Sequence, residues 1–440
     1  MAKANSPSEN VRALQRALYV AAKRNGGRKF PALLDRIARP DVLRDAWEQV
    51  RRNQGAAGID GETLAAVEVY GVERMLEELR ELLLTGRYRP QPSRRVYIPK
   101  PGRPGEERPL SIPRVRDRVA QTAAKLVLEP IFEASFLPSS FGFRPKRSAH
   151  QALEQIRKTV NQGARWVVDL DFKDYYGSLD ENLLLGLVGR RVSDRRVIRL
   201  LRLWMRAGVL VEGETLAETT GVAQGGPISP LMSNIYGHAV DALWAKEASH
   251  LGTLVRYADD GVVLCRSEAA AQQALRWLQR TAQALKLQVH PDKTRVVDLS
   301  EGADGFDFLG FQHRLVRSWR TSKYSCQCWP SQRAMVSLRA KIRQIAAPRW
   351  RLQEPIGVIV EELNRVLRGW CNYFRWGNSS RQFSRIDRYV HERLALFDSK
   401  KRRKHGRRWG QVHTTAWFAR LGVFSLSGRV RYTGAATATT

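Results

Sequence analysis

The first part of the chain has the hydrophobic pattern of amphipathic helices. Across residues 11–82 apolar positions recur every three or four residues, as in DVLRDAWEQVRR, with charged residues between them. The pattern stops at NQGAAGIDG (residues 53–61), where three glycines and an aspartate favour a loop. We therefore predict a helical N-terminal region that is interrupted by one loop.

The middle of the chain mixes strand and helix patterns. Residues 94–113 (RRVYIPKPGRPGEERPLSIP) form two strand-like runs around a Gly/Pro turn, which predicts a hairpin rich in cations. WVVDLDF (residues 166–172) has the pattern of a short buried strand, and TLVRYADDGVVLC has that of two apolar strands around a tight acidic turn. Helical sequence lies between these strands, and GVAQGGPISP leads into one of the helices. This order predicts an α+β domain in which helices back an antiparallel sheet.

The last part of the chain changes to basic helices. After FDFLGFQHR, residues 333–345 and 355–374 have helical spacing, so we place a domain boundary near Leu315. The chain then divides into a helical N-terminal extension, a mixed α+β domain, a helical domain and a basic C-terminal region. These regions are residues 1–84, 85–314, 315–398 and 399–440.

The balance of charge indicates a nucleic-acid partner. Lys and Arg number 74 against 43 Asp and Glu, a formal net charge of +31, and an excess of that size promotes binding to polyanions. The excess is concentrated in residues 311–440, which hold 27 basic and 6 acidic residues, whereas residues 1–310 hold 47 and 37. The C-terminal third is therefore predicted to bind a polyanion, and the rest keeps enough acid to hold metal.

Cysteine content and hydropathy indicate the cellular compartment. The four cysteines are too few for a dense disulfide framework, and they lack the C-x-x-C spacing that is typical of zinc sites. No apolar run approaches 18 residues, and the N-terminus lacks the apolar stretch of a signal peptide. These features predict a reducing, cytoplasmic location.

Two adjacent acids give the sharpest chemical signal. Asp259 and Asp260 lie between apolar runs with Gly261 behind them, and Asp-Gly in that setting favours a tight hairpin turn. Taken alone, D-D-G is more often a solvated turn. The case for a site improves with a third acid in an apolar strand, where a charge is costly without a metal or partner. Asp169 and Asp171 share one strand face, so spacing does not choose between them.

Three converging carboxylates would repel one another without cations between them, and all-oxygen sites of this kind suit Mg²⁺. Two ions about 3.5–4 Å apart would clamp the attacking 3′-hydroxyl and the leaving pyrophosphate of a nucleotidyl transfer. Lys100 and Arg108 in the basic hairpin could bind a triphosphate, although a solvated hairpin is an equal alternative. Gln224 and Gly225 precede a helix start where backbone can approach a ligand, a weak signal by itself. The ensemble predicts a polymerase site.

Because these motifs occur in one fixed order, the sequence resembles the group II intron reverse transcriptases and maturases over about residues 11–432. The resemblance implies a right-hand polymerase fold with fingers and palm, followed by an α-helical thumb or maturase domain. The loop NQGAAGIDG resembles the family's N-terminal motif. The basic hairpin resembles its fingertip, which implies that Lys100 and Arg108 contact the incoming deoxynucleotide triphosphate. DFKDYYGSLD resembles its first palm motif, which puts the metal ligand at Asp171 and a steric gate against ribose at Tyr176.

Other segments take their roles from the same resemblance. VAQGGPISPLMSNIY implies that Gln224 and Gly225 pack against the nascent base pair, and RYADDGVVL supplies Asp259 and Asp260 as catalytic metal ligands. PSSFGFRPKRSAHQAL resembles the template-facing fingers segment, and HPDKT resembles a closing palm motif. The nucleic-acid contacts that these two segments imply are Arg144, Lys146 and Lys293.

LNRVLRGWCNYFRW (residues 363–376) resembles the thumb or maturase domain. Its aromatic residues Trp370, Tyr373 and Phe374 have near-helical spacing, and we assign them to packing, which is the commoner role. The block KKRRKHGRR is of a kind that is usually solvated, but in this context it is predicted to bind a duplex. The implied nucleic-acid contacts here are Arg368, Arg375, Lys400, Lys401, Arg402, Arg403 and Lys404.

The resemblance implies an RNA-directed DNA polymerase that uses two Mg²⁺ ions and also binds its group II intron RNA, assisting splicing and retrohoming by target-primed reverse transcription. Its partners would be the intron RNA, an RNA template with a DNA primer, target DNA and deoxynucleotide triphosphates. The sequence shows no H-N-H nuclease with paired cysteines, so we expect no nicking of the second strand and a need for a ready primer, such as a nascent strand at a replication fork. Gly177 stands where related motifs often carry a polar residue.

Two alternatives stay open. A splicing factor without polymerase activity would have no reason to keep Asp171, Asp259 and Asp260 together, which argues against it. A related reverse transcriptase recruited to phage defence, spacer acquisition or repair would share the catalytic motifs. The maturase-like segment and the basic block favour an intron partner over that second alternative.

Overall fold

The computed structural model describes residues 8–99, 105–211, 214–216, 221–300, 305–318, 322–404, 406 and 411–431. The chain forms two compact units. The first comprises Met1–Ile98, Glu107–Ala152 and Trp166–Val296, and the second comprises Pro99–Glu106, Leu153–Arg165 and Val297–Thr440. The change of unit after Val296 comes earlier than the predicted boundary near Leu315, which lies inside a strand of the second unit.

Helices surround a buried central helix in the first unit. Most of the N-terminal helices pack on α6 (Val115–Glu133), whose residues are buried around most of its circumference, and the fourth packs on the fifth. These helices are α1 (Glu9–Arg24), α2 (Leu34–Ile37), α3 (Pro40–Arg52), α4 (Leu64–Tyr70) and α5 (Val72–Leu84). The predicted helical region is confirmed, and the loop between α3 and α4 contains the predicted break at residues 53–61.

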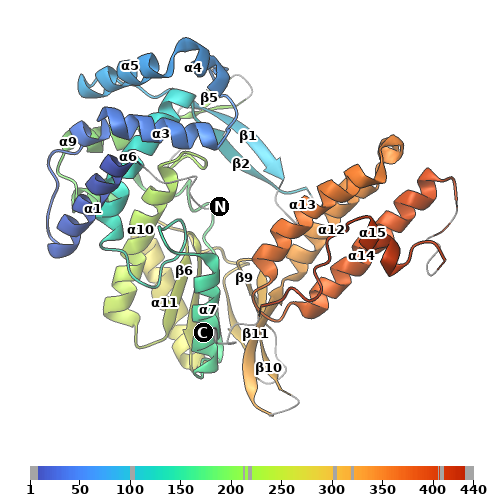
Figure 1. Cartoon of the computed structure of the whole chain (residues 1–440). Coiled ribbons are helices and arrows are strands. Elements are labelled where there is room, and N and C mark those ends of the chain that lie inside the picture. The colour runs from blue at the N-terminus through green and yellow to red at the C-terminus, as the bar shows by residue number, and fades with distance from the viewer. Residues whose placement is uncertain are drawn as a thin grey trace. The chain divides into compact units, whose positions relative to one another are not determined.

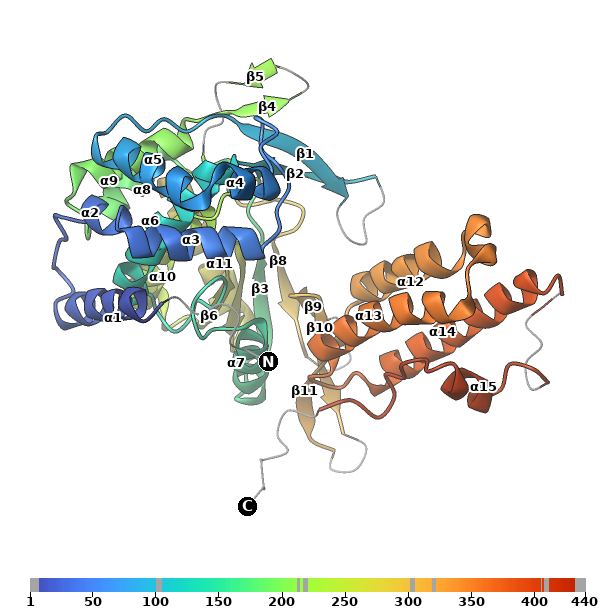
Figure 2. The same ribbon diagram turned by 45° about the horizontal axis from the view of Figure 1, so that its top comes forward.

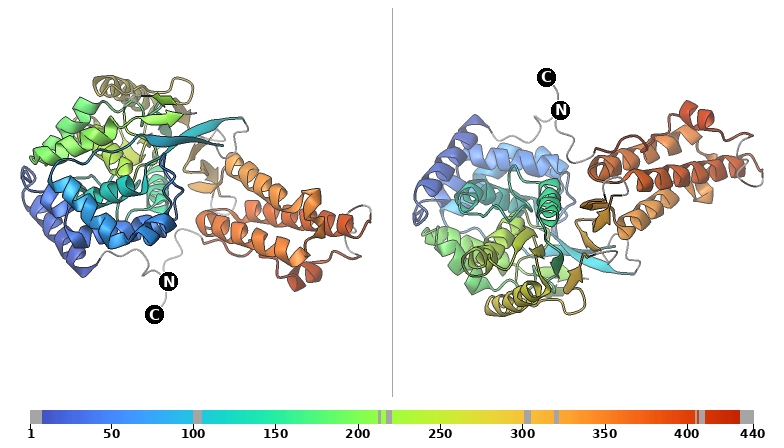
Figure 3. Two further views of the ribbon diagram at one scale, coloured as in Figure 1. Left: turned by 90° about the horizontal axis from the view of Figure 1, so that it is seen from above. Right: turned by 90° about the horizontal axis from the view of Figure 1, so that it is seen from below.

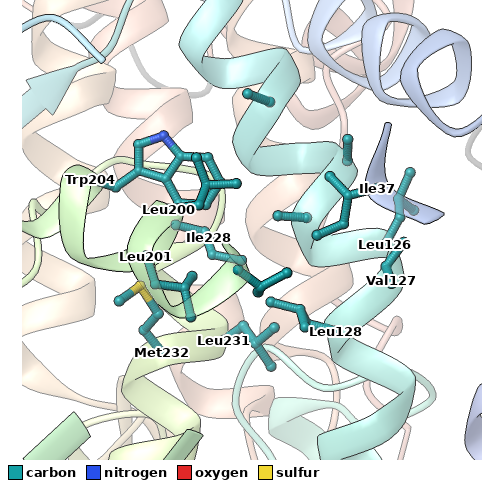
Figure 4. Close-up of a cluster of buried hydrophobic side chains, with 14 of the residues drawn as sticks. Ile37, Leu126, Val127, Leu128, Leu200, Leu201, Trp204, Ile228, Leu231 and Met232 are labelled. Atoms are coloured by element: carbon teal, nitrogen blue, oxygen red, sulfur yellow. The ribbon is translucent and has the colours of Figure 1, made fainter. Parts of the chain in front are cut away.

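A second group of helices completes this core. Figure 4 shows Leu128 of α6 beside Leu231 of α10 (Ser229–Leu243), and Leu126 and Val127 of α6 on the side of Ile37. Buried side chains of α9 (Arg195–Met205) belong to the same core. The helix α8 (Glu181–Gly189) contributes further buried leucines. Each fully buried leucine stabilises the fold by about 1.5–3 kcal/mol.

A four-stranded sheet has the strand order β6-β7-β3-β8, in which β6, β7 and β3 of the first unit pair antiparallel and β8 begins in that unit. Its strands are β3 (Trp166–Leu170), β6 (Thr253–Tyr257), β7 (Asp260–Cys265) and β8 (Arg295–Asp298). Helix α10 and helix α11 (Glu268–Ala284) lie along this sheet (Figure 1) and cover its buried valines and leucines. The chain therefore has the predicted α+β character.

A smaller sheet has the order β2-β1-β4-β5 (Figure 2). Two of its strands, β1 (Ser93–Pro99) and β2 (Glu107–Ile112), are the strands of the predicted basic hairpin. Residues 100–104, including Lys100, lie outside the described residues. The strands β4 (Val209–Val211) and β5 (Glu214–Leu216) were not predicted, and β4 pairs in parallel with β1.

The second unit has a three-stranded sheet and a helical bundle. The sheet consists of β9 (Phe306–Phe308), β10 (Phe311–Arg317) and β11 (Tyr324–Pro330), in the order β11-β10-β9. The helix α7 (Ala149–Asn161) begins in the first unit and ends in the second, where Asn161 Oδ1 accepts the N–H of Cys326 at 2.8 Å.

Three long helices follow this sheet and lie side by side (Figure 3). The helical pattern predicted the first two of them and missed the third. They are α12 (Gln332–Ala346), α13 (Ile356–Phe374) and α14 (Ser380–Lys401), and the short α15 (Thr415–Arg420) comes after them. The predicted packing role of Trp370, Tyr373 and Phe374 is confirmed, because the Phe374 ring lies 4.6 Å from that of Trp370 and 4.8 Å from that of Tyr373. No helix in the described part of the chain combines the length and apolar character needed to span a bilayer.

Candidate active site

The acidic residues lie at one end of the sheet β6-β7-β3-β8. In the antiparallel pairing of β3 with β7, Leu170 faces Gly261, so Asp171, one residue further along, lies level with Asp260. Asp259 comes directly before β7, in the turn from β6. Strands that are distant in the sequence thus bring Asp171, Asp259 and Asp260 to the same edge of the first unit.

The hairpin turn lies one step before the Asp-Gly pair. Tyr257 pairs with Asp260, which leaves Ala258 and Asp259 as the two turn residues. Ala258 has a φ of 58°, a left-handed conformation that costs an L residue about 1–2 kcal/mol. Gly261 is an ordinary strand residue, so the prediction that Asp260 and Gly261 form the turn is wrong. Contacts with the rest of the fold, described next, override the local preference of Asp-Gly.

Gly142 packs directly against this turn. A Cβ atom on Gly142 would lie 2.4 Å from the Ala258 nitrogen, so only glycine lets the two backbones approach so closely. The neighbouring Phe141 N–H donates to the carbonyl of Arg256 at 2.9 Å, and Asn234 Nδ2 donates to the Gly142 carbonyl at 2.8 Å. The segment FGF (residues 141–143) therefore helps to shape the acidic turn.

Arg256 supports the turn from inside the protein. Its side chain is 5% exposed and forms an ion pair with Asp241, with 2.6 Å between Nη2 and Oδ2. Nη1 donates to the Ala258 carbonyl at 2.7 Å, and Nη2 donates to Ser140 Oγ at 2.9 Å. Sequence reasoning missed Arg256 and Asp241. The available signal was the single arginine in the apolar run TLVRY, because a buried charge needs a partner.

The charged neighbours of Asp169, which lies in β3, differ from those of Asp171, which directly follows this strand. Burial raises the pKa of Asp259, and the negative charge of Asp171 raises it further, so carboxylates from two strands act on one another. Asp171 Oδ2 lies 3.1 Å from Lys293 Nζ. Asp169 Oδ2 instead lies 3.8 Å from Arg295 Nε. Asp171 therefore faces the acidic turn, and Lys293, predicted to contact phosphate, neutralises Asp171 here.

Asp171, Asp259 and Asp260 offer the oxygen donors that hard divalent cations prefer. In the ranges that the structure describes, no three His, Cys, Asp or Glu side chains form a cluster that could hold a metal ion as they stand. A divalent cation would offset the repulsion that raises the pKa of Asp259, and it would replace the ammonium of Lys293 beside Asp171. The donor chemistry thus fits a divalent metal, provided that the carboxylates close around it.

Tyr176 lies near the acids in the turn that follows β3. Burial raises the pKa of Tyr176, and the negative charge of Asp259 raises it further. The Tyr176 carbonyl accepts the N–H of Val222 at 2.8 Å. A Cβ atom on Gly221 would lie 2.3 Å from that carbonyl oxygen. The backbone of Tyr176 is therefore fixed by the Gly-rich segment before α10.

Gln224 and Gly225 pack against the end of β2. The Ser111 N–H donates to the Gln224 carbonyl at 2.7 Å. Gly225 has a φ of 125°, and a Cβ atom there would lie 2.3 Å from the Ser111 carbonyl oxygen. Arg108 is exposed on the same strand. The strand β2 thus joins the Gly-rich segment to the basic hairpin, as parts of one wall in the first unit.

Arg144 has an internal role. Its side chain is 3% exposed and pairs with Glu133 at 2.7 Å, and its Nη1 also donates to the carbonyls of Leu137 and Ser140 at 2.6 and 2.7 Å. This burial contradicts the predicted contact of Arg144 with nucleic acid. Arg144 instead fixes the loop that leads to Gly142. Lys146 lies two residues further on and is exposed, as a contact residue should be.

The basic residues of the second unit do not form a free tail at their start. Lys400 and Lys401 belong to the last turn of α14, and Lys401 Nζ donates to the carbonyls of Leu352 and Glu354, each at 2.8 Å. Arg402 Nε lies 3.0 Å from Asp398 Oδ1. The remaining predicted contacts are exposed or half-buried: Arg368, Arg375, Lys400, Arg403 and Lys404.

Comparison with known protein families gives two matches. Residues 98–313 match the family described as reverse transcriptase (RNA-dependent DNA polymerase). Residues 335–415 match the group II intron, maturase-specific domain. The first match includes Asp171, Asp259 and Asp260, and the second includes the helices from α12 to α14 almost entirely.

Individual relatives agree with these matches. The chain is 35% identical over 350 residues to protein YkfC of Escherichia coli K12, covering 71% of this chain and 89% of YkfC. It is 35% identical over 214 residues to the group II intron-encoded protein LtrA of Lactococcus lactis, covering 48% of this chain and 35% of LtrA. An uncharacterized 91 kDa protein of a cob intron in Schizosaccharomyces pombe is 32% identical over 209 residues, which is 47% of this chain and 25% of that protein. The chain thus spans most of YkfC but only about a third or less of the two intron proteins.

Proposed function

The chain belongs to the group II intron reverse transcriptases and maturases, and from that premise we propose that Asp171, Asp259 and Asp260 form the polymerase site of an RNA-directed DNA polymerase. One observation carries the proposal. The pairing of β3 with β7 puts Asp171 level with Asp260, next to Asp259 in the β6–β7 turn, which supports a single site built from two strands. In this proposal the sheet β6-β7-β3-β8 is the palm, the β1–β2 hairpin belongs to the fingers, and the helices from α12 onward are the thumb and maturase domain.

We propose that the three carboxylates hold two Mg²⁺ ions. When bound, such ions stabilise the charge on the attacking 3′-oxygen and on the leaving pyrophosphate. The chain's own residues supply the geometry. Arg256 and Gly142 hold the Ala258–Asp259 turn, so that both acids are positioned before substrate arrives. Lys293 balances the charge of Asp171 until a cation replaces it.

The incoming deoxynucleotide triphosphate would bind between the palm and the basic hairpin. Arg108 is exposed and can bind phosphate bidentately, and Lys100 would add a point charge. The Tyr176 ring would lie against the sugar and exclude a 2′-hydroxyl, since its backbone is fixed by Val222 and Gly221. Gln224 and Gly225 would face the nascent base pair.

The second unit would bind the group II intron RNA and the primer-template duplex. Residues 311–440 hold 27 basic and 6 acidic residues, and this excess of positive charge supports a polyanion partner. Bound intron RNA would be stabilised in its splicing-competent form, and the same particle would then copy the RNA from a DNA 3′ end in retrohoming. Target DNA would supply that end.

Primer extension on an RNA template with Mg²⁺ and deoxynucleotides tests the polymerase claim. Wild type should extend the primer, and Asp259→Asn with Asp260→Asn should not, while RNA binding measured without nucleotides stays near wild type. If neither protein extends the primer although both bind RNA, the polymerase claim fails and a splicing-only maturase takes its place.

A further inference from the structure

The second unit contains a cavity of about 490 Å³ between α12, α14 and the ends of β10 and β11. Its size is within the range of about 300–1,000 Å³ that is usual for small-ligand sites. It is lined only by second-unit residues, so none of the palm residues takes part. We call it the α12–α14 cavity.

The α14 wall of this cavity is one helix face. Gln382, Arg385, Arg388, Tyr389 and Glu392 line it, and residues three or four positions apart lie on the same side of a helix. Helix α12 contributes Arg339 on the opposite side. The cavity therefore combines arginines with an amide, a carboxylate and an aromatic ring. Arginines and aromatic rings stack on unpaired bases, and polar side chains hydrogen-bond to base edges.

Positive charge dominates the rim of the cavity. Arg385 and Arg388 are exposed, and within the described ranges neither has a carboxylate partner. The Arg339 guanidinium lies 5.8 Å from the centroid of the Tyr389 ring, which keeps the ring in place at the cavity wall. Phosphate groups near Arg385 and Arg388 would therefore be attracted, because the arginines of the lining, Arg339, Arg385 and Arg388, outnumber its single carboxylate, Glu392.

Two hydrogen-bonding atoms of the lining residues lack a partner among the residues that the structure describes. Arg339 Nε and Gln382 Oε1 are shielded from solvent and form no hydrogen bond with any of these residues. Buried polar groups without a hydrogen bond are energetically unfavourable. A ligand with both donors and acceptors, such as the edge of a nucleobase, would let these side chains form hydrogen bonds by a small rotation.

We propose that the α12–α14 cavity binds one unpaired nucleotide of the RNA partner. The base would enter beside Tyr389, with Gln382 at its edge, and the flanking phosphates would lie on Arg385 and Arg388. A paired stretch would not fit, because its bases are stacked and their edges are occupied. The inference rests on the proposed RNA-binding function, and it adds a bulge or loop nucleotide as the feature that this surface selects.

The test compares two RNA hairpins that differ by a single bulged nucleotide. Their dissociation constants are measured by filter binding at fixed salt, without nucleotides, so that polymerase activity does not enter the readout. Arg385→Gln with Arg388→Gln removes two charges from the rim. Arg365→Gln with Arg381→Gln removes two charges from exposed positions in the same unit that do not line the cavity.

We expect wild type to bind the bulged hairpin more tightly than the unbulged one. In the variant Arg385→Gln with Arg388→Gln, the ratio of the two dissociation constants should fall by about tenfold, the size of one lost stacking or phosphate contact. The control variant should weaken both hairpins equally and keep the preference. Equal weakening of both hairpins by both variants would overturn the proposal, because it would mean non-specific charge attraction alone. The same preference for a DNA hairpin would overturn the assignment to RNA.

A 4-thiouridine at the bulge gives an independent readout that does not depend on a variant folding. Irradiation should crosslink it to Tyr389 or to the neighbouring Trp329, which also lines the cavity, and mass spectrometry would locate the adduct. Crosslinks confined to the first unit would contradict the cavity as the binding site. If the wild-type protein binds neither RNA hairpin, the proposed function on which the inference rests is refuted instead.

Discussion

Ala258 keeps a left-handed conformation in the turn between Tyr257 and Asp260, and its neighbours make that conformation possible. The Arg256 guanidinium holds the Ala258 carbonyl, and Gly142 leaves room for the Ala258 nitrogen. The position of the proposed catalytic acids therefore depends on Arg256 and Gly142, which support the turn from within the fold. Two predictions at the scale of single residues follow from this dependence.

Gly142→Ala should displace the acidic turn, because its Cβ atom would lie 2.4 Å from the Ala258 nitrogen. Gly261→Ala is the matched control, since its Cβ atom would meet only the Leu170 side chain at 3.6 Å. We expect primer extension to fall about tenfold or more in the first variant and to stay near wild type in the second. Loss of extension in Gly261→Ala alone would mean that the turn uses Asp260 and Gly261 after all.

Arg256→Met should destabilise the protein by about 3–5 kcal/mol, because it leaves Asp241 buried without its partner. Adding Asp241→Asn should restore much of that stability, since the buried charge is then gone. Extension should stay low in the double variant, because nothing holds the Ala258 carbonyl. Urea unfolding and primer extension would be measured on the same preparations, and recovery of both together would refute a positioning role.

At the scale of elements, helical and strand periodicity predicted most of the fold. The N-terminal helices, the two strands of the basic hairpin, β3, and the helices α12 and α13 all lie where apolar spacing placed them. The strand β4 was missed because three residues are too short to show a period. The acidic turn was misplaced because Asp-Gly is a local preference, whereas Arg256 and Gly142 act from distant parts of the sequence.

The same limit applies to the candidate site. The acids and the basic hairpin could be found by residue type and order, whereas the burial of Arg144 could not. A motif arginine beside exposed Lys146 has no local sign that Glu133 pairs with it. Likewise, the separation of Asp169 from Asp171 needs the neighbours Arg295 and Lys293, which come from a later strand and loop.

Asp194 gives a prediction for one element, because it caps α9 and ties it to the N-terminal helices. Burial by itself would raise the pKa of Asp194, but Arg196 and the N–H groups of Leu33 and Leu34 outweigh it, so the pKa is lowered. Because the pKa of Asp194 is lower in the folded protein than in the unfolded chain, ionised Asp194 stabilises the fold at pH values above its pKa in the unfolded chain, near 3.8. This contribution is lost as the pH falls through the pKa of Asp194 in the folded protein.

Asp194→Asn keeps a capping side chain but removes the charge, so it should cost about 2 kcal/mol at neutral pH. The difference from wild type should shrink as the pH falls below about 3.8. Urea unfolding at pH 7 and at pH 3 measures the difference in unfolding free energy between wild type and Asp194→Asn at each pH. A difference that stays constant between these two pH values would show that the charge of Asp194 is not what stabilises this junction.

At the scale of the whole molecule, charge divides the work between two regions. Residues 1–310 keep 37 acids, among them the three of the proposed polymerase site, while residues 311–440 carry a basic surplus and the α12–α14 cavity. One chain would thus copy RNA in its first unit and select RNA in its second. This account depends above all on Asp171 being the acid that works with Asp259.

The most direct measurement is primer extension by Asp171→Asn beside Asp169→Asn. Each substitution removes one carboxylate from the same strand region. They differ in the cation that loses its partner, which is Lys293 for Asp171→Asn and Arg295 for Asp169→Asn. We predict that Asp171→Asn loses extension by about 10²–10³-fold or more, while Asp169→Asn extends nearly as well as wild type and both proteins melt at similar temperatures. Loss of extension in Asp169→Asn with retention in Asp171→Asn would contradict the site.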